Sequence, residues 1–184
     1  ILTCKYKMAV KVICWCGDRL NWLLQNLGID LINNFEHEIK QNSARINDVN
    51  IYHKGVQQVL QNRESRGTMN SIAEFRNILD AMQPIVLTNS AWDTAVATGV
   101  FTRMDFELVS ALTLTYNTQA RFDENYRTEL RTMLSPSNLN NKNLEAIVYN
   151  ASQLVSNIIA QESELAAYYD QVLAILRSHL SKKS

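Results

Sequence analysis

The fold is organised around the stretch Asn89-Ser-Ala-Trp-Asp-Thr-Ala-Val-Ala-Thr-Gly-Val-Phe-Thr-Arg-Met-Asp-Phe-Glu-Leu-Val109 in the middle of the chain. Its pattern is that of a short helix, a glycine stop and the capped start of a longer helix. Asn89 or Ser90 can cap the first helix. Gly99 can take the left-handed conformation that ends a helix, and Asp105 can cap the helix that follows.

Trp92 lies on the short helix beside the small residues Ala91 and Ala95, which let other helices close over a large ring. We therefore predict that Trp92 is buried where the short helix meets longer helices. On this interpretation the stretch is a packing device. Its predicted structural core consists of Trp92, Gly99, Asp105, Val109 and Tyr116.

The composition favours an all-α protein with a single bundle domain over residues 18–184. Of the 184 residues, 46% are hydrophobic, which is enough for one substantial core. Five glycines and two prolines leave long stretches free for helices. The 18 basic and 18 acidic residues cancel, and this balance disfavours binding to nucleic acid.

Residues 18 to 61 are predicted to form one long helix, because one row of positions alternates spacings of four and three, as in a heptad seam. The row consists of Phe35, Ile39, Asn42, Ile46, Val49, His53, Val56 and Leu60. Asn42 and His53 are its polar members. They indicate either a ligand or pH switch, or an Asn that sets helix register and a His that is satisfied or at an edge; we favour the second interpretation.

A second heptad helix is predicted over about residues 141 to 180. Its row consists of Leu144, Val148, Ala151, Val155, Ile158, Glu162, Leu165, Tyr169, Val172, Leu176 and His179. Glu162 interrupts the row, and we expect a partly solvated carboxylate beside a basic neighbour.

Shorter helices are predicted between the two long ones. Ser71 and Glu74 have capping-box spacing at the start of a helix that runs to about Gln83, and the helix after Asp105 should reach about Leu134. We predict an antiparallel bundle in which the middle segments pack against one end, with Trp92 in a distal cap, and the chain termini lie together at the other end.

The sequence contains no common catalytic, cofactor-binding or metal-binding motif, so we expect no enzyme activity and no cofactor. The cluster Glu36-His37-Glu38 is dense, but adjacent residues on a helix point in different directions, which argues against a metal site. Cys4, Cys14 and Cys16 are expected to be free thiols.

The motifs Glu38-Ile39-Lys-Gln-Asn42, Ser90-Ala-Trp-Asp-Thr-Ala-Val-Ala-Thr-Gly99 and Met104-Asp-Phe-Glu-Leu-Val109, followed by Tyr116, resemble those of a group of uncharacterised bacterial proteins. In that group a single N-terminal membrane span carries a small helical extracytoplasmic domain. The resemblance covers about residues 20 to 130. It implies a periplasmic location and no catalytic residues. The chain departs from the pattern before Asp18, where a full apolar span is missing.

Residues 1–17 form a basic, apolar segment that is predicted to lie near a membrane. Residues 1–16 contain three lysines and no acidic residue, and the chain after Asp170 also carries only basic charges. An antiparallel bundle brings both stretches to one end, where each basic residue near an anionic surface contributes roughly 1 kcal/mol. Tryptophans can sit at the headgroup level. The predicted membrane-proximal residues are Lys5, Lys7, Lys11, Trp15, Trp22, Lys182 and Lys183.

These patterns favour a non-enzymatic, membrane-associated helical interaction or scaffold module. Its expected partners are a membrane surface and either another protein or a second copy of the chain. The alternative is a ligand-sensing extracytoplasmic bundle that acts through a separate signalling partner. The residues alone leave a cytoplasmic location open.

Overall fold

The computed structural model describes residues 2–67, 71–80, 82, 85–135 and 143–183, with the backbone alone for residues 2–28, 79, 80, 182 and 183. In this described part the protein is all-α, without strands. The helices are α1 (Leu2–Arg66), α2 (Ile72–Asp80), α3 (Ser90–Thr98), the 3-10 helix η1 (Val100–Arg103), α4 (Phe106–Met133) and α5 (Leu144–Lys183).

Helix α1 is longer at both ends than the predicted range of 18 to 61. It runs without interruption from Leu2, and it continues through the polar residues after Gln61 to Arg66. Polar side chains alone do not stop a helix, whereas the left-handed Gly67 that follows, at φ 57°, does. The predicted end of this helix at residue 61 is therefore five residues too early.

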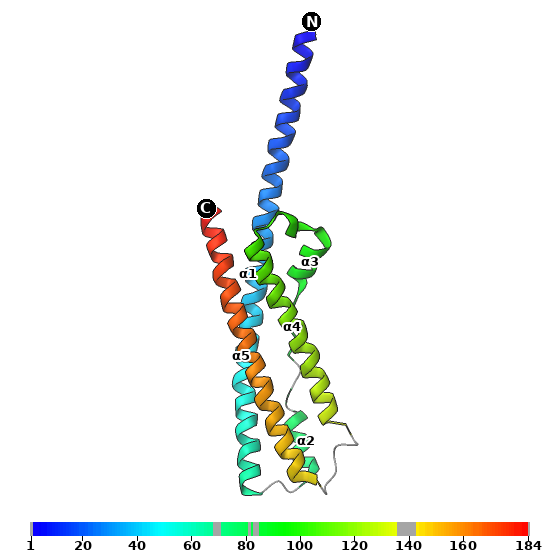
Figure 1. Cartoon of the computed structure of the whole chain (residues 1–184), viewed down its shortest axis with the longest axis vertical. Coiled ribbons are helices and arrows are strands. Elements are labelled where there is room, and N and C mark those ends of the chain that lie inside the picture. The colour runs from blue at the N-terminus through cyan, green and yellow to red at the C-terminus, as the bar shows by residue number, and fades with distance from the viewer. Residues whose placement is uncertain (1, 68–70, 81, 83–84, 136–142, 184) are drawn as a thin grey trace.

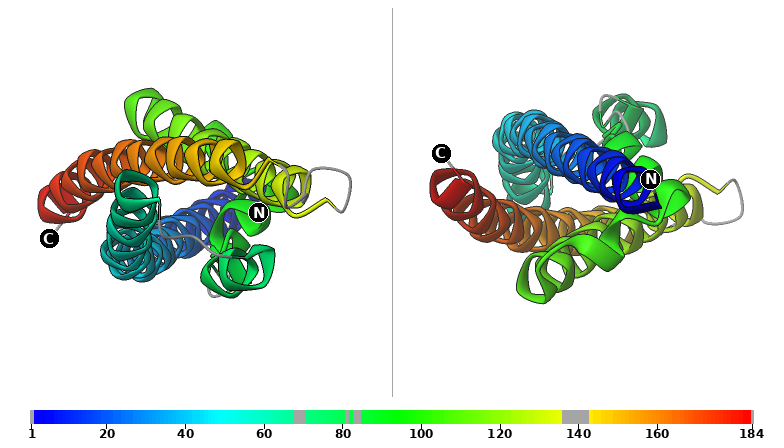
Figure 2. Two further views of the ribbon diagram at one scale, coloured as in Figure 1. Left: turned by 90° about the horizontal axis from the view of Figure 1, so that it is seen from below. Right: turned by 90° about the horizontal axis from the view of Figure 1, so that it is seen from above.

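The two long helices lie side by side and antiparallel, and α5 also packs against α4 (Figure 1). Helices α2 and α3 lie along the side of α1 away from α5 (Figure 2). The first part of α1 extends past the end of α5 and stands clear of the other described helices (Figure 1). The result is an elongated bundle with one helix projecting from it. The prediction that the two ends of the chain lie together was therefore wrong, because the start of α1 lies well beyond the end of α5 (Figure 1).

The heptad rows form the core between α1 and α5. In the α1 row every member except the half-buried Val49 is buried. In the α5 row only Leu144 and His179, at the two ends, are half-buried. Burial of these long apolar rows stabilises the pairing at about 25 cal/mol per Å² of apolar surface removed from water. The helices and their mutual packing thus match the predicted all-α bundle.

The short helices lie at opposite ends of the bundle, which differs from the prediction. Glu74 of α2 pairs with Arg63 near the end of α1, at 2.9 Å. The start of α4, just after α3, lies instead beside the last turns of α5, where Asp105 is 3.9 Å from His179. The distal-cap prediction for the α3 region was therefore wrong: this region lies at the end where α5 finishes and α1 leaves the bundle (Figure 1).

The segment between α2 and α3 explains this arrangement. Residues 85–89 have no helical structure and run along α1, where the Val86 carbonyl accepts a hydrogen bond from Arg45 at 3.0 Å. Along this segment the chain advances towards α3, from Val86 beside Arg45 to Thr88 beside Asn42. The segment contains three consecutive aliphatic residues. Ile85 is buried and Leu87 is half-buried, so only Val86 is exposed to solvent.

Candidate functional site

Helix α3 is capped by a carboxylate from another helix. Glu38 on α1 is only 5% exposed, and its Oε2 accepts hydrogen bonds from Ser90 Oγ at 2.6 Å and from the Ala91 backbone N–H at 3.0 Å. Its Oε1 accepts a third bond from the Tyr116 hydroxyl at 2.6 Å. Within the described residues the Asn89 side chain makes no capping bond. A negative charge at a helix N-terminus is favourable, so Glu38 both caps and anchors α3.

One turn further along α1, Asn42 joins four parts of the chain. Its Nδ2 donates to the Thr88 carbonyl at 2.7 Å and to Gln119 Oε1 at 3.3 Å, and its Oδ1 accepts from the Thr88 N–H at 3.0 Å. Gln119 Oε1 also accepts from the Tyr169 hydroxyl at 2.7 Å. These bonds connect α1, the segment before α3, α4 and α5. Asn42 is fully buried and satisfied, which fits a role in setting helix register.

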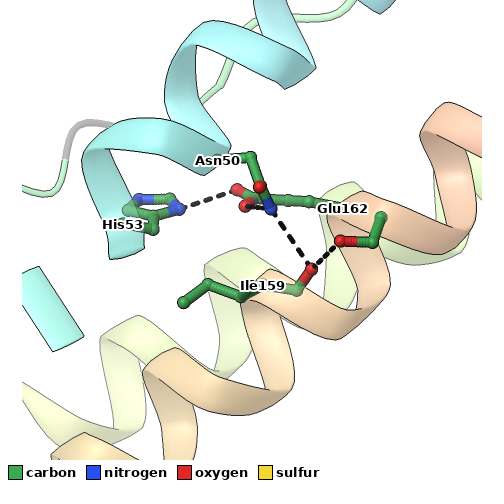
Figure 3. A network of polar contacts seen from close by, with 5 residues as sticks. Asn50, His53, Ile159 and Glu162 are labelled. Atoms are coloured by element: carbon green, nitrogen blue, oxygen red, sulfur yellow. Dashed lines mark hydrogen bonds and ion pairs between the residues drawn. The ribbon is translucent and has the colours of Figure 1, made fainter. Parts of the chain in front are cut away.

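A second polar layer lies in the core between α1 and α5 (Figure 3). His53 Nδ1 is 2.7 Å from Glu162 Oε1, and both side chains are fully buried. Asn50 Nδ2 donates to Glu162 Oε2 at 3.0 Å and to the Ile159 carbonyl at 3.3 Å. The prediction that Glu162 is partly solvated was wrong. Glu162, the polar member of the α5 row, lies opposite His53 of the α1 row, and the two side chains pair in the core.

The outer nitrogen of His53 has no polar partner. Its Nε2 is buried and makes no hydrogen bond in the described part of the chain. The ring packs against Tyr126, with centroids 5.9 Å apart and an angle of 28° between the ring planes. Because Glu162 accepts the Nδ1 hydrogen bond, a neutral His53 carries its proton on Nδ1. A catalytic acid or base must reach a substrate, and this fully buried pair is instead placed to hold α1 and α5 together.

Three buried tyrosines are held in their protonated forms. Burial raises the pKa of Tyr116, and the hydrogen bond to Glu38 raises it further. Burial raises the pKa of Tyr169 and of Tyr126 as well, with smaller contributions from the nearby carboxylates of Glu38 and Glu162 respectively. These phenols therefore act as hydrogen-bond donors or packing groups at neutral pH.

The Glu36-His37-Glu38 cluster is dispersed by the helix geometry. Glu36 binds Lys40 at 2.7 Å and Arg177 of α5 at 3.3 Å, while His37 is exposed and Glu38 turns towards α3. The hydrogen bond from Lys40 lowers the pKa of Glu36, and Arg177 lowers it further. In the part of the chain that the structure describes, no group of three or more metal-ligating side chains is placed to hold an ion.

Trp92 is half-buried and not fully enclosed as predicted. Its ring stacks on Tyr116, with centroids 5.1 Å apart, and contacts Phe101 at 4.9 Å. Helix α3 faces the core through Ala91 and Ala95, which are both buried, and this leaves Trp92 at the edge between α3 and α4.

The other predicted core positions of this stretch serve different purposes. Gly99 ends α3 in the left-handed conformation at φ 63°, and Asp105 Oδ1 caps α4 by accepting from the Glu107 N–H at 2.9 Å. Val109 is only half-buried, and its neighbour Leu108 is the core residue, at 1% exposed. The inward face of α4 at this point lies one residue earlier than predicted.

Beside Trp92 an open hollow of about 450 Å³ lies between α4 and the α3 region. Its wall includes Trp92, Asp93, Tyr116, Asn117, Asp123 and Arg127. Asp123 and Arg127 are paired with one another at 2.9 Å. The hollow combines an aromatic surface with carboxylates, and it is partly open to solvent.

The predicted membrane-proximal residues lie on the start of α1 and the end of α5, which the structure does not bring together, because α1 extends well past the end of α5 (Figure 1). Lys5, Lys7, Lys11, Trp15 and Trp22 belong to α1, and Lys182 and Lys183 belong to the end of α5; their side chains lie outside the described part. Over the described residues, none of the helices contains a stretch both long and apolar enough to span a membrane.

Comparison of the chain with family models, with curated proteins and with solved structures found no match. The resemblance to bacterial membrane-anchored proteins therefore stays a prediction.

The sequence patterns did not indicate the roles of Glu38, Asn50 and Gln119. Glu38 and Asn50 are each one residue away from a position of the α1 row, close enough to the seam to be drawn into the core. The available signal was the presence of Asn42, His53 and Glu162 on apolar rows, since buried polar groups require partners nearby.

Proposed function

We propose that this chain is a non-enzymatic helical interaction module that is held at an anionic membrane surface by one end. The observation that carries the proposal is the antiparallel pairing of α1 and α5, with α1 extending past the end of α5 (Figure 1). This arrangement leaves the lysine-containing start of α1 as a projection from the bundle, on the side where α5 also finishes. The periplasmic side of a bacterial membrane is proposed from the family resemblance alone.

Charge supports this orientation. Residues 1–16 carry Lys5, Lys7 and Lys11 without an acidic residue, in a protein whose formal net charge is zero. Lys182 and Lys183 lie at the end of α5, which finishes before the projecting start of α1, and Arg177 is engaged with Glu36. Each basic residue near an anionic surface contributes roughly 1 kcal/mol, so the three lysines of the projecting helix give useful affinity at low salt.

The use of the buried polar groups supports an interaction role over a catalytic one. The hydrogen bonds of four buried polar residues join different segments of the bundle: Glu38, Asn42, Gln119 and Glu162. A rigid bundle of this kind is well suited to present a surface or a projecting helix to a partner. His53 and Glu162 are fully buried and therefore out of reach of a substrate.

The test is sedimentation of the purified chain with anionic and neutral liposomes at low and high salt. We expect binding to anionic liposomes that weakens with salt, and loss of binding when Lys5, Lys7 and Lys11 are all changed to Gln. A matched control changes the exposed bundle residues Lys54, Arg76 and Arg121 to Gln, which removes the same number of positive charges. If the chain stays in the supernatant under every condition, this end does not bind membranes by its own affinity.

The alternative function is a ligand-sensing bundle that signals through a separate protein. The hollow beside Trp92 favours it, since an indole face with Asp93 nearby can receive a small molecule. Native mass spectrometry of the purified chain tests this function. A small molecule that co-purifies with the parent but not with Trp92→Ala would favour the sensor over the scaffold.

A further inference from the structure

The projecting part of α1 carries a second heptad row, separate from the one that binds α5. The row alternates spacings of four and three without exception and consists of Leu2, Tyr6, Ala9, Ile13, Cys16, Leu20, Leu23 and Leu27. All charged residues of positions 2–28 lie off this row: Lys5, Lys7, Lys11, Asp18 and Arg19. An apolar row sustained over three to four heptads is typical of a helix that pairs with another helix.

This second row is out of phase with the core of the bundle. Continuing the α5-binding row back from Phe35 in steps of three and four reaches Ile32 and Gly28, and then the polar residues Gln25, Asn21 and Asp18. The apolar row is displaced from that continuation by two positions. At 3.6 residues per turn, two positions correspond to a rotation of about 200°, so at any one level the two rows lie on nearly opposite sides of the helix. The projecting helix is thus patterned for a partner that approaches from a different side than α5.

We infer that the partner is the same segment of a second copy of this chain, paired in the antiparallel direction. With the twofold axis between residues 14 and 15, Leu20 lies opposite Ala9 of the partner subunit, and Ile13 lies opposite Cys16 of the partner subunit. Each of these layers combines a large and a small residue, which lets the layers interdigitate. A parallel pair would instead place Ala9 on Ala9, Cys16 on Cys16 and Tyr6 on Tyr6, as alternating thin and thick layers.

Charge selects the same direction. The lysines at positions 5, 7 and 11 form a cluster in the first half of the segment, and Asp18 is the single acidic residue, in the second half. A parallel pair would bring two lysine clusters together at one end. The antiparallel pair separates them and places each cluster beside the half in which Asp18 and Arg19 of the partner subunit cancel, so that repulsion is reduced.

The pairing does not depend on the proposed membrane contact. Lys7 and Lys11 occupy positions on the continuation of the α5-binding row and not on the apolar row. In the antiparallel dimer these lysines lie along the paired segment between two bundles and not at a free end, so the dimer and membrane contact by one end are alternative states of this segment, and the dimer forms in solution without lipid. Failure of liposome binding would therefore leave the dimer intact, and loss of the dimer would leave the basic end in place.

The first test is the mass of the full chain in lipid-free buffer, measured by sedimentation equilibrium over a range of concentrations. We expect a dimer for the parent, at least a tenfold weaker dimer for Leu20→Asp, and no change for Gln25→Asp, which adds the same charge off the row. Thermal unfolding of the bundle should be unaffected in both variants, since residues 20 and 25 precede it. A parent that is monomeric throughout overturns the inference. If Leu20→Asp then abolishes liposome binding, lipid and not a second copy covers the row.

The second test is direction. Two chains are made in which Cys4, Cys14 and Cys16 are replaced by Ser; one also carries Ala9→Cys and the other Leu20→Cys. An antiparallel pair places these positions opposite one another, so oxidation should give an intermolecular disulfide in the mixture and little in either chain alone. Cross-linking of each chain with itself, without preference for the mixture, would overturn the antiparallel assignment.

Discussion

His53 Nδ1 and Glu162 Oε1 lie 2.7 Å apart, and each residue is the polar interruption of its own apolar row. The rows of α1 and α5 therefore have a single register in which these two residues meet. A slip of one heptad would place an ionisable side chain against aliphatic residues on both helices. Such a mismatch costs several kcal/mol, because an unpaired buried polar group loses its hydration without replacement.

Glu162→Ala should destabilise the bundle by about 3 to 5 kcal/mol, because it leaves His53 and Asn50 buried without their carboxylate. The double variant His53→Leu with Glu162→Met removes both polar members at similar volume, and its stability should be close to that of the parent. Urea unfolding followed by circular dichroism measures both. Equal midpoints for the parent and Glu162→Ala would mean that the pair contributes nothing to stability.

Glu38→Ala should release the start of α3, since Ser90 Oγ, the Ala91 N–H and the Tyr116 hydroxyl all lose their acceptor. Hydrogen bonds to charged groups are worth about 1.5 to 3 kcal/mol, so the total cost should be at least 3 kcal/mol. Hydrogen exchange at the Ala91 amide should become faster than the exchange that requires global unfolding, because the start of α3 opens locally. Tyr116→Phe removes one of the three bonds and is the control, with a smaller cost and a protected Ala91 amide.

Trp92→Ala should cost about 2 to 3 kcal/mol, below the 3 to 5 kcal/mol typical of a fully buried tryptophan, because the ring is half-buried. Most of the loss comes from the stacking on Tyr116 and Phe101. Chemical denaturation gives the value. A variant as stable as the parent would place the role of Trp92 in the open hollow, as a ligand-contacting residue.

Alkaline pH should unfold the bundle through its buried tyrosines. The pKa values of Tyr116, Tyr126 and Tyr169 are raised in the folded state, so their contribution to stability is complete below the unfolded value of about 10 and is lost as the pH rises above it. Phenolate absorbance and circular dichroism should show these three tyrosines ionising only together with loss of helix. Complete ionisation of all seven tyrosines while the helices persist would contradict this.

The long helices and their apolar rows could be predicted because the four-three spacing can be recognised within a single segment, without knowledge of the helix that it packs against. Gly99 and Asp105 could also be assigned, since a left-handed stop and an N-cap are decided by neighbouring residues. Where α1 ends was less predictable. Its last turns are polar, and only Gly67 marks the stop.

The contacts between segments could not be predicted in the same way. Placing His53 opposite Glu162 requires the relative register of two helices that are separated by most of the chain. The burial of Glu38 depends on α3, and the position of α3 depends on how far residues 85–89 carry the chain along α1. In both cases the environment of a residue is decided by a segment far away in the sequence, which the local pattern does not reveal.

The pairing of the first helix with the last has a consequence during translation. The α1 row is complete at Leu60, but the α5 row that covers it is complete only at His179. At roughly 5 to 20 residues per second, the apolar side of α1 waits for its partner for on the order of ten seconds after leaving the ribosome. A polypeptide whose translation stops before residue 144 lacks α5. The apolar row of its α1 then stays exposed to chaperones, proteases and other nascent chains.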